Sequence, residues 1–269
     1  MAETTWDPTQ YARFGDERGR PFRDLLARVG AAEPAVVVDL GCGNGPLTLT
    51  LSARWPRAEV IGLDSSPEML EAARTLDTDG SVRWVRADLR DWDPSSLGVA
   101  PDVVVTNATL QWVPDHVHLI TRVVSALAPG GWFAMQVPDN FGAPSHALMR
   151  DAASAHRRST DLLPAVSRLA VEPPEAYLEL LAGLGCEVDV WSTTYLHVLD
   201  PAGEVDDPVL EWVRGTGLRP VLAVLTDPDE REEFLADYRA RLREAYPRSA
   251  AGVVMSFRRT FAVAHTREA

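Results

Sequence analysis

Lysine is absent from this chain: its 269 residues include 26 basic side chains, and every one of them is arginine. The absence excludes a Schiff-base lysine, the lysine of a phosphate-binding P-loop and a lysine general base. A genome rich in G and C favours arginine codons, which accounts for the composition as a whole. Arginine nevertheless supplies planar, forked donors that suit the recognition of carboxylates.

Cysteine is scarce, and long apolar runs are missing. Cys42 and Cys186 are too few for a disulfide framework and are not spaced as metal ligands, so we expect two packed thiols and no metal site. No run of about 18 apolar residues occurs, and the first residues lack the basic and then apolar order of a signal peptide. We therefore expect a soluble, cytoplasmic protein that binds no membrane.

Positive charge is also in deficit. The formal net charge is −13, and no dense basic run is present. Broad binding to a phosphate backbone is therefore disfavoured, which argues against DNA and RNA as partners, while a local basic pocket stays open. The length suffices for one large domain, or for a core with a smaller lobe, around a sizeable apolar interior. No feature implies a protein partner.

The most informative stretch is residues 35–46, which read Ala-Val-Val-Val-Asp-Leu-Gly-Cys-Gly-Asn-Gly-Pro. Its small and β-branched start predicts a strand buried on both faces of a parallel sheet. The alternate glycines Gly41, Gly43 and Gly45 allow a sharp turn and the close approach of a ligand, and Pro46 suits the first turn of a helix. A dinucleotide fingerprint would place its third glycine where Pro46 stands, so the spacing disfavours NAD.

The pattern around this stretch predicts an α/β fold in which strands and helices alternate. Strands are expected at 59–64, 82–88, 102–107, 132–137, 186–199 and 257–264, and helices at 22–29, 47–55, from Pro67, and at 117–127, 145–156, 174–184, 207–216 and 228–245. Asp64 ends the second strand and follows Gly41 by about the 20 residues typical of an acid that binds ribose hydroxyls. Its alternative role is to cap the helix from Pro67, although Ser65 and Ser66 can do that.

Asp39 with the three glycines that follow it resembles motif I of the class I S-adenosylmethionine (SAM) methyltransferases. The resemblance implies a Rossmann-like α/β fold with a mostly parallel seven-stranded sheet, helices on both faces and a helical cap. It implies SAM as the cofactor. The cofactor-binding residues that we expect on this basis are Arg18, Asp39, Gly41, Gly43, Gly45, Asp64, Ser65, Asp88, Leu89 and Asn107.

Segments spread over nearly the whole chain resemble the bacterial trans-aconitate 2-methyltransferases. They are Trp6, Tyr11 and Phe14 with residues 17–21, then 64–67, 107–116, 136–140, 185–195, 211–220, 244–247 and 257–261. The resemblance implies transfer of a methyl group from SAM to one carboxylate of trans-aconitate or a related small tricarboxylic acid. The products would be the monomethyl ester and S-adenosylhomocysteine.

We expect four parts along the chain: an N-terminal lid at 1–30, a SAM-binding core at 31–138, a helical cap and substrate region at 139–250 that includes a core strand near 186–199, and a final core strand and tail at 251–269. An ionised carboxylate is already a nucleophile at neutral pH, so the reaction needs alignment and desolvation rather than a general base or a metal.

The residues that we expect to orient such a substrate are Gln111, Trp112, Tyr195, Arg219, Tyr246, Arg258 and Arg259. Neighbours on a regular strand face opposite sides, so Arg258 and Arg259 cannot both point inward. For each arginine the alternative is a solvated surface ion pair, and for Trp112 it is simple packing.

His116 and His118 lie at the start of an expected helix, and we interpret both as surface or capping residues, keeping His116 as a pocket candidate. Three functions remain open: a small-acid O-methyltransferase, a SAM methyltransferase for another small molecule, and a noncatalytic SAM-binding module. An NAD oxidoreductase is a more distant alternative.

Overall fold

The computed structural model describes the backbone of residues 15–167 and 171–268, and the side chains of these ranges from residue 19 onward. Within them the chain forms two compact units. The larger unit comprises 15–137, 171–192 and 260–268, and the smaller unit comprises 138–167 and 193–259. Some residues that the sequence analysis singled out lie outside the described part of the chain, namely Trp6, Tyr11, Phe14 and the side chain of Arg18.

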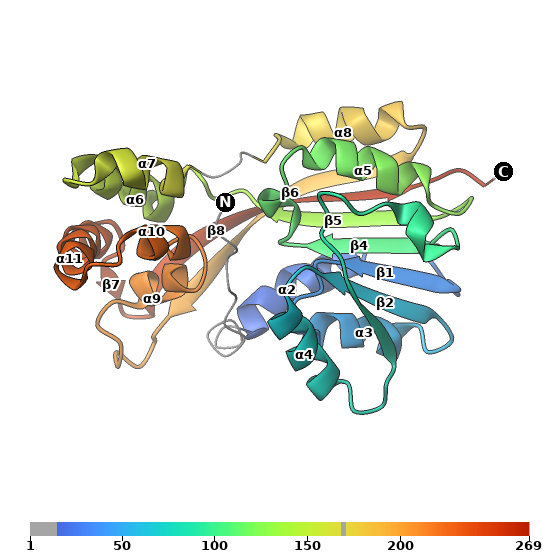
Figure 1. Cartoon of the computed structure of the whole chain (residues 1–269), viewed down its shortest axis with the longest axis horizontal. Coiled ribbons are helices and arrows are strands. Elements are labelled where there is room, and N and C mark those ends of the chain that lie inside the picture. The colour runs from blue at the N-terminus through green and yellow to red at the C-terminus, as the bar shows by residue number, and fades with distance from the viewer. Residues whose placement is uncertain (1–14, 168–170, 269) are drawn as a thin grey trace. The chain divides into compact units, whose positions relative to one another are not determined.

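A sheet with the strand order β3-β2-β1-β4-β5-β8-β6 organises the fold (Figure 1). The first five strands pair in parallel, and β1 lies between β2 and β4. A short strand, β7, pairs antiparallel with β8 and brings the sheet to eight strands rather than the predicted seven. The strands are β1 (Val36–Leu40), β2 (Glu59–Asp64), β3 (Val82–Arg86), β4 (Val103–Asn107), β5 (Trp132–Pro138), β6 (Glu187–Leu199), β7 (Arg248–Ser249) and β8 (Gly252–His265).

Strand β8 runs antiparallel to β5. The amide of Gly130 donates to the carbonyl oxygen of Arg267 at 3.2 Å, and the amide of Thr266 donates to Gly131 at 2.9 Å, so the end of β8 lies beside the start of β5. Both long strands contribute residues to both units: 187–192 and 260–265 belong to the larger unit, and 193–199 and 252–259 to the smaller.

Helices cover both faces of the sheet, which explains why the apolar run of β1 is buried throughout. Val36, Val38 and Leu40 belong to a hydrophobic core with residues of α5 (His116–Ser125) and α8 (Pro174–Gly183). Val37 and Asp39 alternate to the other face, on which α3 (Pro46–Arg54) contacts β2 and α4 (Pro67–Leu76) contacts β2 and β3. Helix α2 (Gly15–Leu26) precedes β1.

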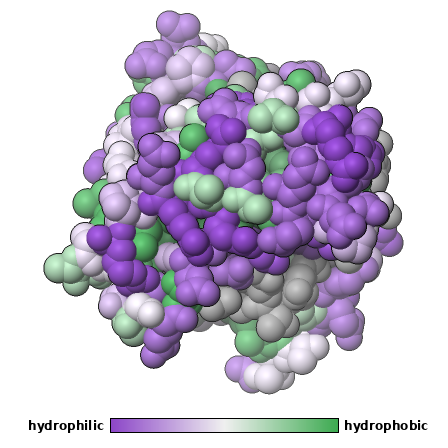
Figure 2. Space-filling model, turned by 90° about the vertical axis from the view of Figure 1, so that its left-hand side faces the viewer, coloured by the Kyte–Doolittle hydropathy of each residue, from purple (hydrophilic) through white to green (hydrophobic). Residues whose placement is uncertain are grey.

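The smaller unit packs helices beside its share of β6, β7 and β8. Contacts join α6 to α7 and α11, α7 to α10, and α9 to α11. The helices are α6 (Pro144–Ala155), α7 (Ser159–Val166), α9 (Pro208–Arg214), α10 (Arg219–Val224) and α11 (Pro228–Ala245). Asp207, which directly precedes α9, pairs with Arg239 of α11 at 3.1 Å and with Arg243 of α11 at 2.7 Å. Hydrophilic residues predominate on the face that Figure 2 shows.

The predicted elements are present, with differences where local signals are weak. The sequence pattern did not predict α7, which contains Pro164, or the short helix α10. The strand predicted to reach Asp88 ends at Arg86, because the Asp88 carbonyl accepts the amides of Asp91 and Trp92 and so begins a turn. Strand β8 begins at Gly252 rather than at Phe257. None of the helices in the described part of the chain combines the length and apolarity that crossing a membrane requires.

Candidate functional site

The glycine loop connects β1 to α3 at the carboxyl edge of the sheet. Gly41, Gly43 and Gly45 all have positive φ, at 78°, 56° and 89°. A Cβ on Gly41 would lie 2.2 Å from Thr109 Oγ1, and one on Gly45 would lie 2.8 Å from the Trp84 ring, so neighbouring side chains fill the space beside both. Among the described residues, and apart from the chain neighbours of Gly43, no heavy atom lies within 4 Å of the corresponding position on Gly43. Gly43 is therefore the point at which a ligand can approach the backbone.

Asp64 faces this point from the end of β2. One carboxylate oxygen accepts the amide of Gly43 at 2.9 Å, and the other accepts the amide of Ser66 at 2.9 Å. Burial raises the pKa of Asp64, and the amides of Ser66 and Gly43 oppose this shift. Ser66 caps α4, and its side chain accepts the amide of Met69. Each oxygen of Asp64 keeps a further lone pair, which can accept a hydroxyl proton of a ligand.

Asp39 is a buried acid in β1, with a relative exposure of 3%. The hydroxyl of Thr48, on α3, donates to it at 2.6 Å. Burial raises the pKa of Asp39 to about 7, and the Thr48 hydrogen bond and the Asp64 charge act on it in opposite directions. Its carboxylate therefore links β1 to the helix that follows the loop, which indicates a role in the shape of the loop. Burial also raises the pKa of the neighbouring Cys42 thiol, consistent with a packed cysteine.

The segment after β4 lies against the same loop. Thr109 Oγ1 donates at 3.3 Å to the carbonyl oxygen of Gly41, and Ala108 takes a left-handed φ of 55°. The Gln111 amide donates to the Ala108 carbonyl at 2.6 Å, which supports this unusual conformation. The side-chain oxygens of Asn107 and Gln111 are buried and have no hydrogen-bond partner among the described residues. A ligand that carries N–H donors would satisfy them.

The predicted cofactor-binding residues Asp88 and Leu89 follow the end of β3. The Ala87 amide donates to the Asp64 carbonyl at 3.0 Å, which brings this segment beside β2. Leu89 is buried, whereas Asp88 forms a salt bridge with Arg90 that holds the pKa of the Asp88 carboxyl below its usual range. Ser65 is exposed beside Asp64. These positions fit one edge of a nucleoside pocket, and their role there stays a prediction.

The two arginines of β8 point to opposite sides, as the strand alternation predicts. Arg258 is exposed and forms an ion pair with Asp139 at 3.2 Å. Arg259 is only 4% exposed, and its guanidinium carbon lies 4.5 Å from the centre of the Phe257 ring. The fixed guanidinium of Arg259 is suited to hold a carboxylate, whereas Arg258 has the surroundings of a surface ion pair.

Aromatic side chains surround this part of β8. His197 stacks on Trp212 at 4.8 Å between ring centres and lies 5.8 Å from Phe257, and Tyr195 lies 6.3 Å from His197. All four residues are buried. Tyr195 and Arg259, which the sequence singled out separately, therefore belong to one buried cluster.

Tyr246 and Arg219 lie at helix ends in the smaller unit: Tyr246 follows α11, and Arg219 begins α10. The hydroxyl oxygen of Tyr246 accepts the amide of Ser145 at 2.9 Å, so it serves as a cap for the first turn of α6. Its O–H proton can still be donated to an anion. Arg219 is the first residue of α10 and is half-buried.

His116 was wrongly interpreted as a surface or capping residue. It is 4% exposed, and its Nε2 lies 2.8 Å from the hydroxyl of Tyr177, which in turn accepts the amide of Glu172. Burial lowers the pKa of His116. The contact joins α5 to α8, and the sequence could not reveal it because Tyr177 is distant along the chain. Trp112 is 37% exposed, so it is not a core residue.

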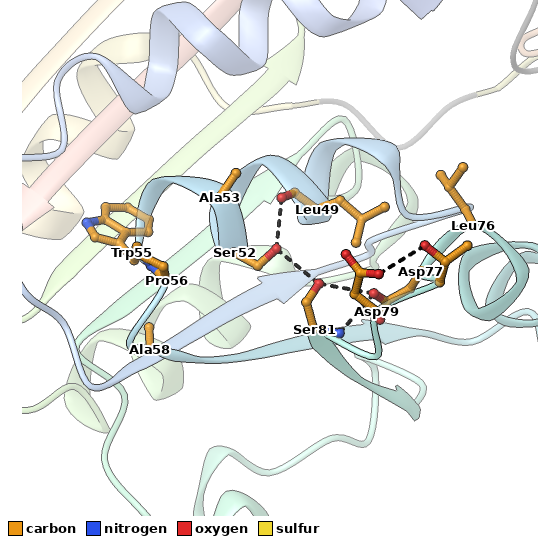
Figure 3. Close-up of a pocket in the computed structure, with 11 residues that line it drawn as sticks. Leu49, Ser52, Ala53, Trp55, Pro56, Ala58, Leu76, Asp77, Asp79 and Ser81 are labelled. Carbon is orange, nitrogen blue, oxygen red and sulfur yellow. Dashed lines mark hydrogen bonds between the residues drawn. The ribbon is translucent and has the colours of Figure 1, made fainter.

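A cavity of about 520 Å³ lies elsewhere in the larger unit, between α3 and the turn from α4 to β3 (Figure 3). Ala58 and Ser81, which line it, directly precede β2 and β3, so the cavity lies at the amino ends of these strands. None of the predicted site residues whose side chains the structure describes lines it. Open α/β sheets bind ligands at the carboxyl ends of their strands, so we assign the functional site to the edge with the glycine loop.

Sequence reasoning missed the side chains that hold the loop from behind, namely Thr48, Trp84 and Thr109. One signal was available: Gly62 lies inside a strand, where glycine often marks the close approach of another group. Trp84 is that group, since it pairs with Gly62 in register.

Comparison with known proteins agrees with this geometry. Residues 37–131 match the family model described as "Methyltransferase domain". Trans-aconitate 2-methyltransferase of Streptomyces avermitilis is 51% identical over 98% of both chains, and that of Streptomyces coelicolor is 50% identical over 98% of this chain and 88% of its own.

A solved structure with a similar fold is phosphoethanolamine N-methyltransferase 2 of Haemonchus contortus, in complex with S-adenosyl-L-methionine. It matches 93% of this chain and 53% of its own with a TM-score of 0.53 at 16% identity, which supports the fold alone. The fold is therefore that of the class I methyltransferases, as predicted. With half of its residues identical to full-length relatives of one name, the chain belongs to the trans-aconitate 2-methyltransferase family.

Proposed function

We propose that this protein transfers a methyl group from SAM to one carboxylate of trans-aconitate. The observation that carries the proposal is the 51% identity to a relative of that name over 98% of both chains. The loop geometry supports it, because the described residues leave the space beside Gly43 open and Asp64 is fixed next to it. The products are the monomethyl ester and S-adenosylhomocysteine.

The residues of the glycine loop fit this cofactor. Asp64 accepts the ribose hydroxyls through its remaining lone pairs, and Gly43 allows the backbone to lie against the ligand. The buried oxygen of Asn107 accepts from the ammonium group of the cofactor, which is the kind of donor that it lacks among the described residues. SAM supplies an electrophilic methyl group on a sulfonium sulfur.

The reaction needs no proton transfer. A carboxylate oxygen of the substrate forms the new bond to the methyl carbon, the sulfur–carbon bond breaks, and its electron pair stays on sulfur. The task of the protein is to align the two groups and to exclude water from them. Gln111 serves this alignment through its hydrogen bond to Ala108, which shapes the segment after β4.

Arginine recognises the carboxylates that are not methylated. A substrate with up to three negative charges approaches a chain of net charge −13, so recognition depends on a local positive group. Arg259 fits this role best because it is buried and lies against Phe257, and Tyr195 of the same cluster offers a hydroxyl donor. Arg219 and the O–H group of Tyr246 are further candidates from the smaller unit.

The test is product analysis by mass spectrometry after incubation of the enzyme with SAM and a panel of acids. Trans-aconitate, cis-aconitate, citrate and isocitrate test the tricarboxylate class, and a dicarboxylic acid such as fumarate tests the need for the third carboxylate. We expect a mass increase of one methylene for trans-aconitate together with stoichiometric S-adenosylhomocysteine. Turnover of another acid at a much higher kcat/KM would replace the proposed substrate, and SAM binding without turnover of any acid would contradict catalysis on this class.

A further inference from the structure

Trp84 lies behind the glycine loop, on the face of the sheet opposite the main core. It pairs in register with Gly62 on β2, and a Cβ on Gly62 would lie 2.7 Å from its six-membered ring. The far edge of the same ring reaches the loop, because a Cβ on Gly45 would lie 2.8 Å from its Cη2 atom. Two glycines thus provide the room that the indole occupies.

Asp77 fixes the orientation of the indole. The Trp84 Nε1 group donates to Asp77 Oδ2 at 3.0 Å, and the same oxygen accepts the amide of Val82 at 3.0 Å. The other oxygen accepts the amide and the hydroxyl of Ser81 at 2.9 and 3.0 Å. Asp77 is 8% exposed and is therefore a rigid acceptor, which leaves the ring little freedom to rotate.

The loop depends on the residue that the ring supports. Gly45 precedes α3, its amide donates to the Cys42 carbonyl at 3.2 Å, and its carbonyl accepts the amide of Leu49 at 3.0 Å. Gly45 thus fixes both the turn that contains Gly43 and the start of the helix. A shift of Gly45 into the space of the ring would therefore change the position of the Gly43 amide relative to Asp64.

We propose that Trp84 is a positioning residue of the cofactor loop: its indole, oriented by Asp77, supports Gly45 and so sets the place of Gly43 relative to Asp64. The inference rests on the proposed function, since it assumes that the loop binds SAM. Trp84 acts through the loop and contacts neither the substrate nor the reacting atoms.

The first test compares Trp84→Phe with Trp55→Phe. Trp55 follows α3 at its far end, is 5% exposed, and donates through Nε1 to the Ala31 carbonyl at 3.1 Å, so its replacement removes a similar ring and hydrogen bond away from the loop. We expect Trp84→Phe to raise the Kd for S-adenosylhomocysteine, measured by calorimetry, by roughly five- to twentyfold. Trp55→Phe should change that Kd by less than about twofold. The two variants should lower Tm by comparable amounts.

Kinetics separate positioning from general damage. In Trp84→Phe the KM for SAM should rise in step with the Kd, whereas kcat at saturating SAM and the KM for trans-aconitate should stay near wild type. A fall in kcat with an unchanged KM for SAM would overturn the proposal, as would equal Kd values for the two variants.

Gly62→Ala tests the same contact from the other side. The backbone of Gly62 does not have the positive φ of the loop glycines, so the added methyl acts through space, against the indole at 2.7 Å and Cys42 Sγ at 3.1 Å. In an otherwise wild-type chain, we expect Gly62→Ala to raise the Kd for S-adenosylhomocysteine by a factor similar to that of Trp84→Phe. In a Trp84→Ala background it should cause a smaller further loss, because the ring is gone and only the contact with Cys42 Sγ remains.

Additive losses in the double variant would show that Trp84 and Gly62 do not act through one contact, and would overturn the inference. Failure of the wild type to bind S-adenosylhomocysteine would instead contradict the proposed function. The two failures are therefore distinguishable in one set of titrations.

Discussion

Asp64 holds the glycine loop and is proposed to bind the cofactor as well, so we expect its replacement to affect affinity more than fold. We expect Asp64→Ala to weaken the binding of S-adenosylhomocysteine by roughly 1.5–3 kcal/mol, because charge-assisted hydrogen bonds to the ribose are lost. Calorimetry gives the Kd, and the melting temperature reports the loss of the bonds from Gly43 and Ser66. Asp79→Ala, an exposed acid at the opposite edge of the sheet, is the control. Wild-type affinity in Asp64→Ala would remove this carboxylate from the cofactor site.

We expect replacement of the two neighbouring arginines of β8 to affect activity very differently. Arg259→Ala should cost on the order of 2–5 kcal/mol in transition-state binding, measured as kcat/KM for trans-aconitate, because a buried substrate charge is left unpaired. Arg259→Lys should recover only part of this, since an ammonium group lacks the planar fork. Arg258→Ala should cost about 1 kcal/mol or less, as expected for an exposed ion pair.

Affinity for S-adenosylhomocysteine should barely change in any of these arginine variants. Arg219→Ala extends the series and should resemble Arg259→Ala if α10 contributes to the anion site. Full activity in all the alanine variants would show that the anion site has been placed in the wrong part of the smaller unit.

Asp39 should make the stability of the fold depend on pH. Burial raises its pKa from 3.8 to about 7, so the folded state holds this proton more tightly than the unfolded state does. Its contribution is therefore most favourable below about pH 4 and is lost as pH rises towards 7. Asp39→Asn keeps an acceptor for Thr48 and removes the charge. The free energy of unfolding of Asp39→Asn minus that of wild type should thus increase by roughly 2–4 kcal/mol between pH 5 and pH 8. A pH-independent difference would contradict a raised pKa.

At the scale of elements, substitutions at different glycines of the loop should affect either stability or ligand affinity. Gly41→Ala places a methyl group 2.2 Å from Thr109 Oγ1 in a left-handed backbone, whereas the methyl group of Gly43→Ala meets no heavy atom of another described segment within 4 Å. We expect Gly43→Ala to cost only about 1–2 kcal/mol of stability, from its φ, and to weaken S-adenosylhomocysteine binding by tenfold or more. Gly41→Ala should be less stable than Gly43→Ala by about 1–3 kcal/mol, because its methyl group overpacks the site. Thermal melts and calorimetry check both, and equal affinities for wild type and Gly43→Ala would contradict a ligand at Gly43.

The parallel strands could be predicted from sequence because each is a short apolar run between turn residues. The segment Glu59–Asp64 was predicted with the bounds that the structure has, and Pro46 and Pro67 begin α3 and α4 as expected. The short helix α10 gave no signal, because its six residues are too few to show a helical period. The roles of Gln111 and Tyr246 as supports for Ala108 and Ser145 depend on tertiary contacts, which no local pattern contains.

At the scale of the whole molecule, the chemistry makes a prediction about metals. A carboxylate nucleophile needs neither a Lewis acid nor a histidine base, so enzyme that has been treated with a chelator and dialysed should keep its activity. Product formation with and without added magnesium checks this. Loss of turnover on chelation, restored by magnesium, would point to a catechol-type mechanism in place of the one proposed.

The glycine loop and the place of Asp64 at the end of its strand followed from spacing, and strand alternation predicted that Arg258 and Arg259 face opposite sides without deciding which one is buried. The placement of supporting groups could not be predicted, because Trp84 and Thr109 reach the loop from other strands. A single sequence indicates which residue types a ligand needs, whereas their supports are determined by packing between distant segments.

Strand β8 sets a limit on how this chain can vary in length. It is one continuous strand from Gly252 to His265, and it carries Arg259 in the smaller unit and Phe261, stacked on Trp191 at 4.8 Å, in the larger. Inserting or deleting one residue before Phe257 would exchange the faces of Arg258 and Arg259 unless a bulge absorbed the change. Descendants of this chain should therefore tolerate substitutions along β8 far better than changes in its residue count, and length variation should concentrate in the loops.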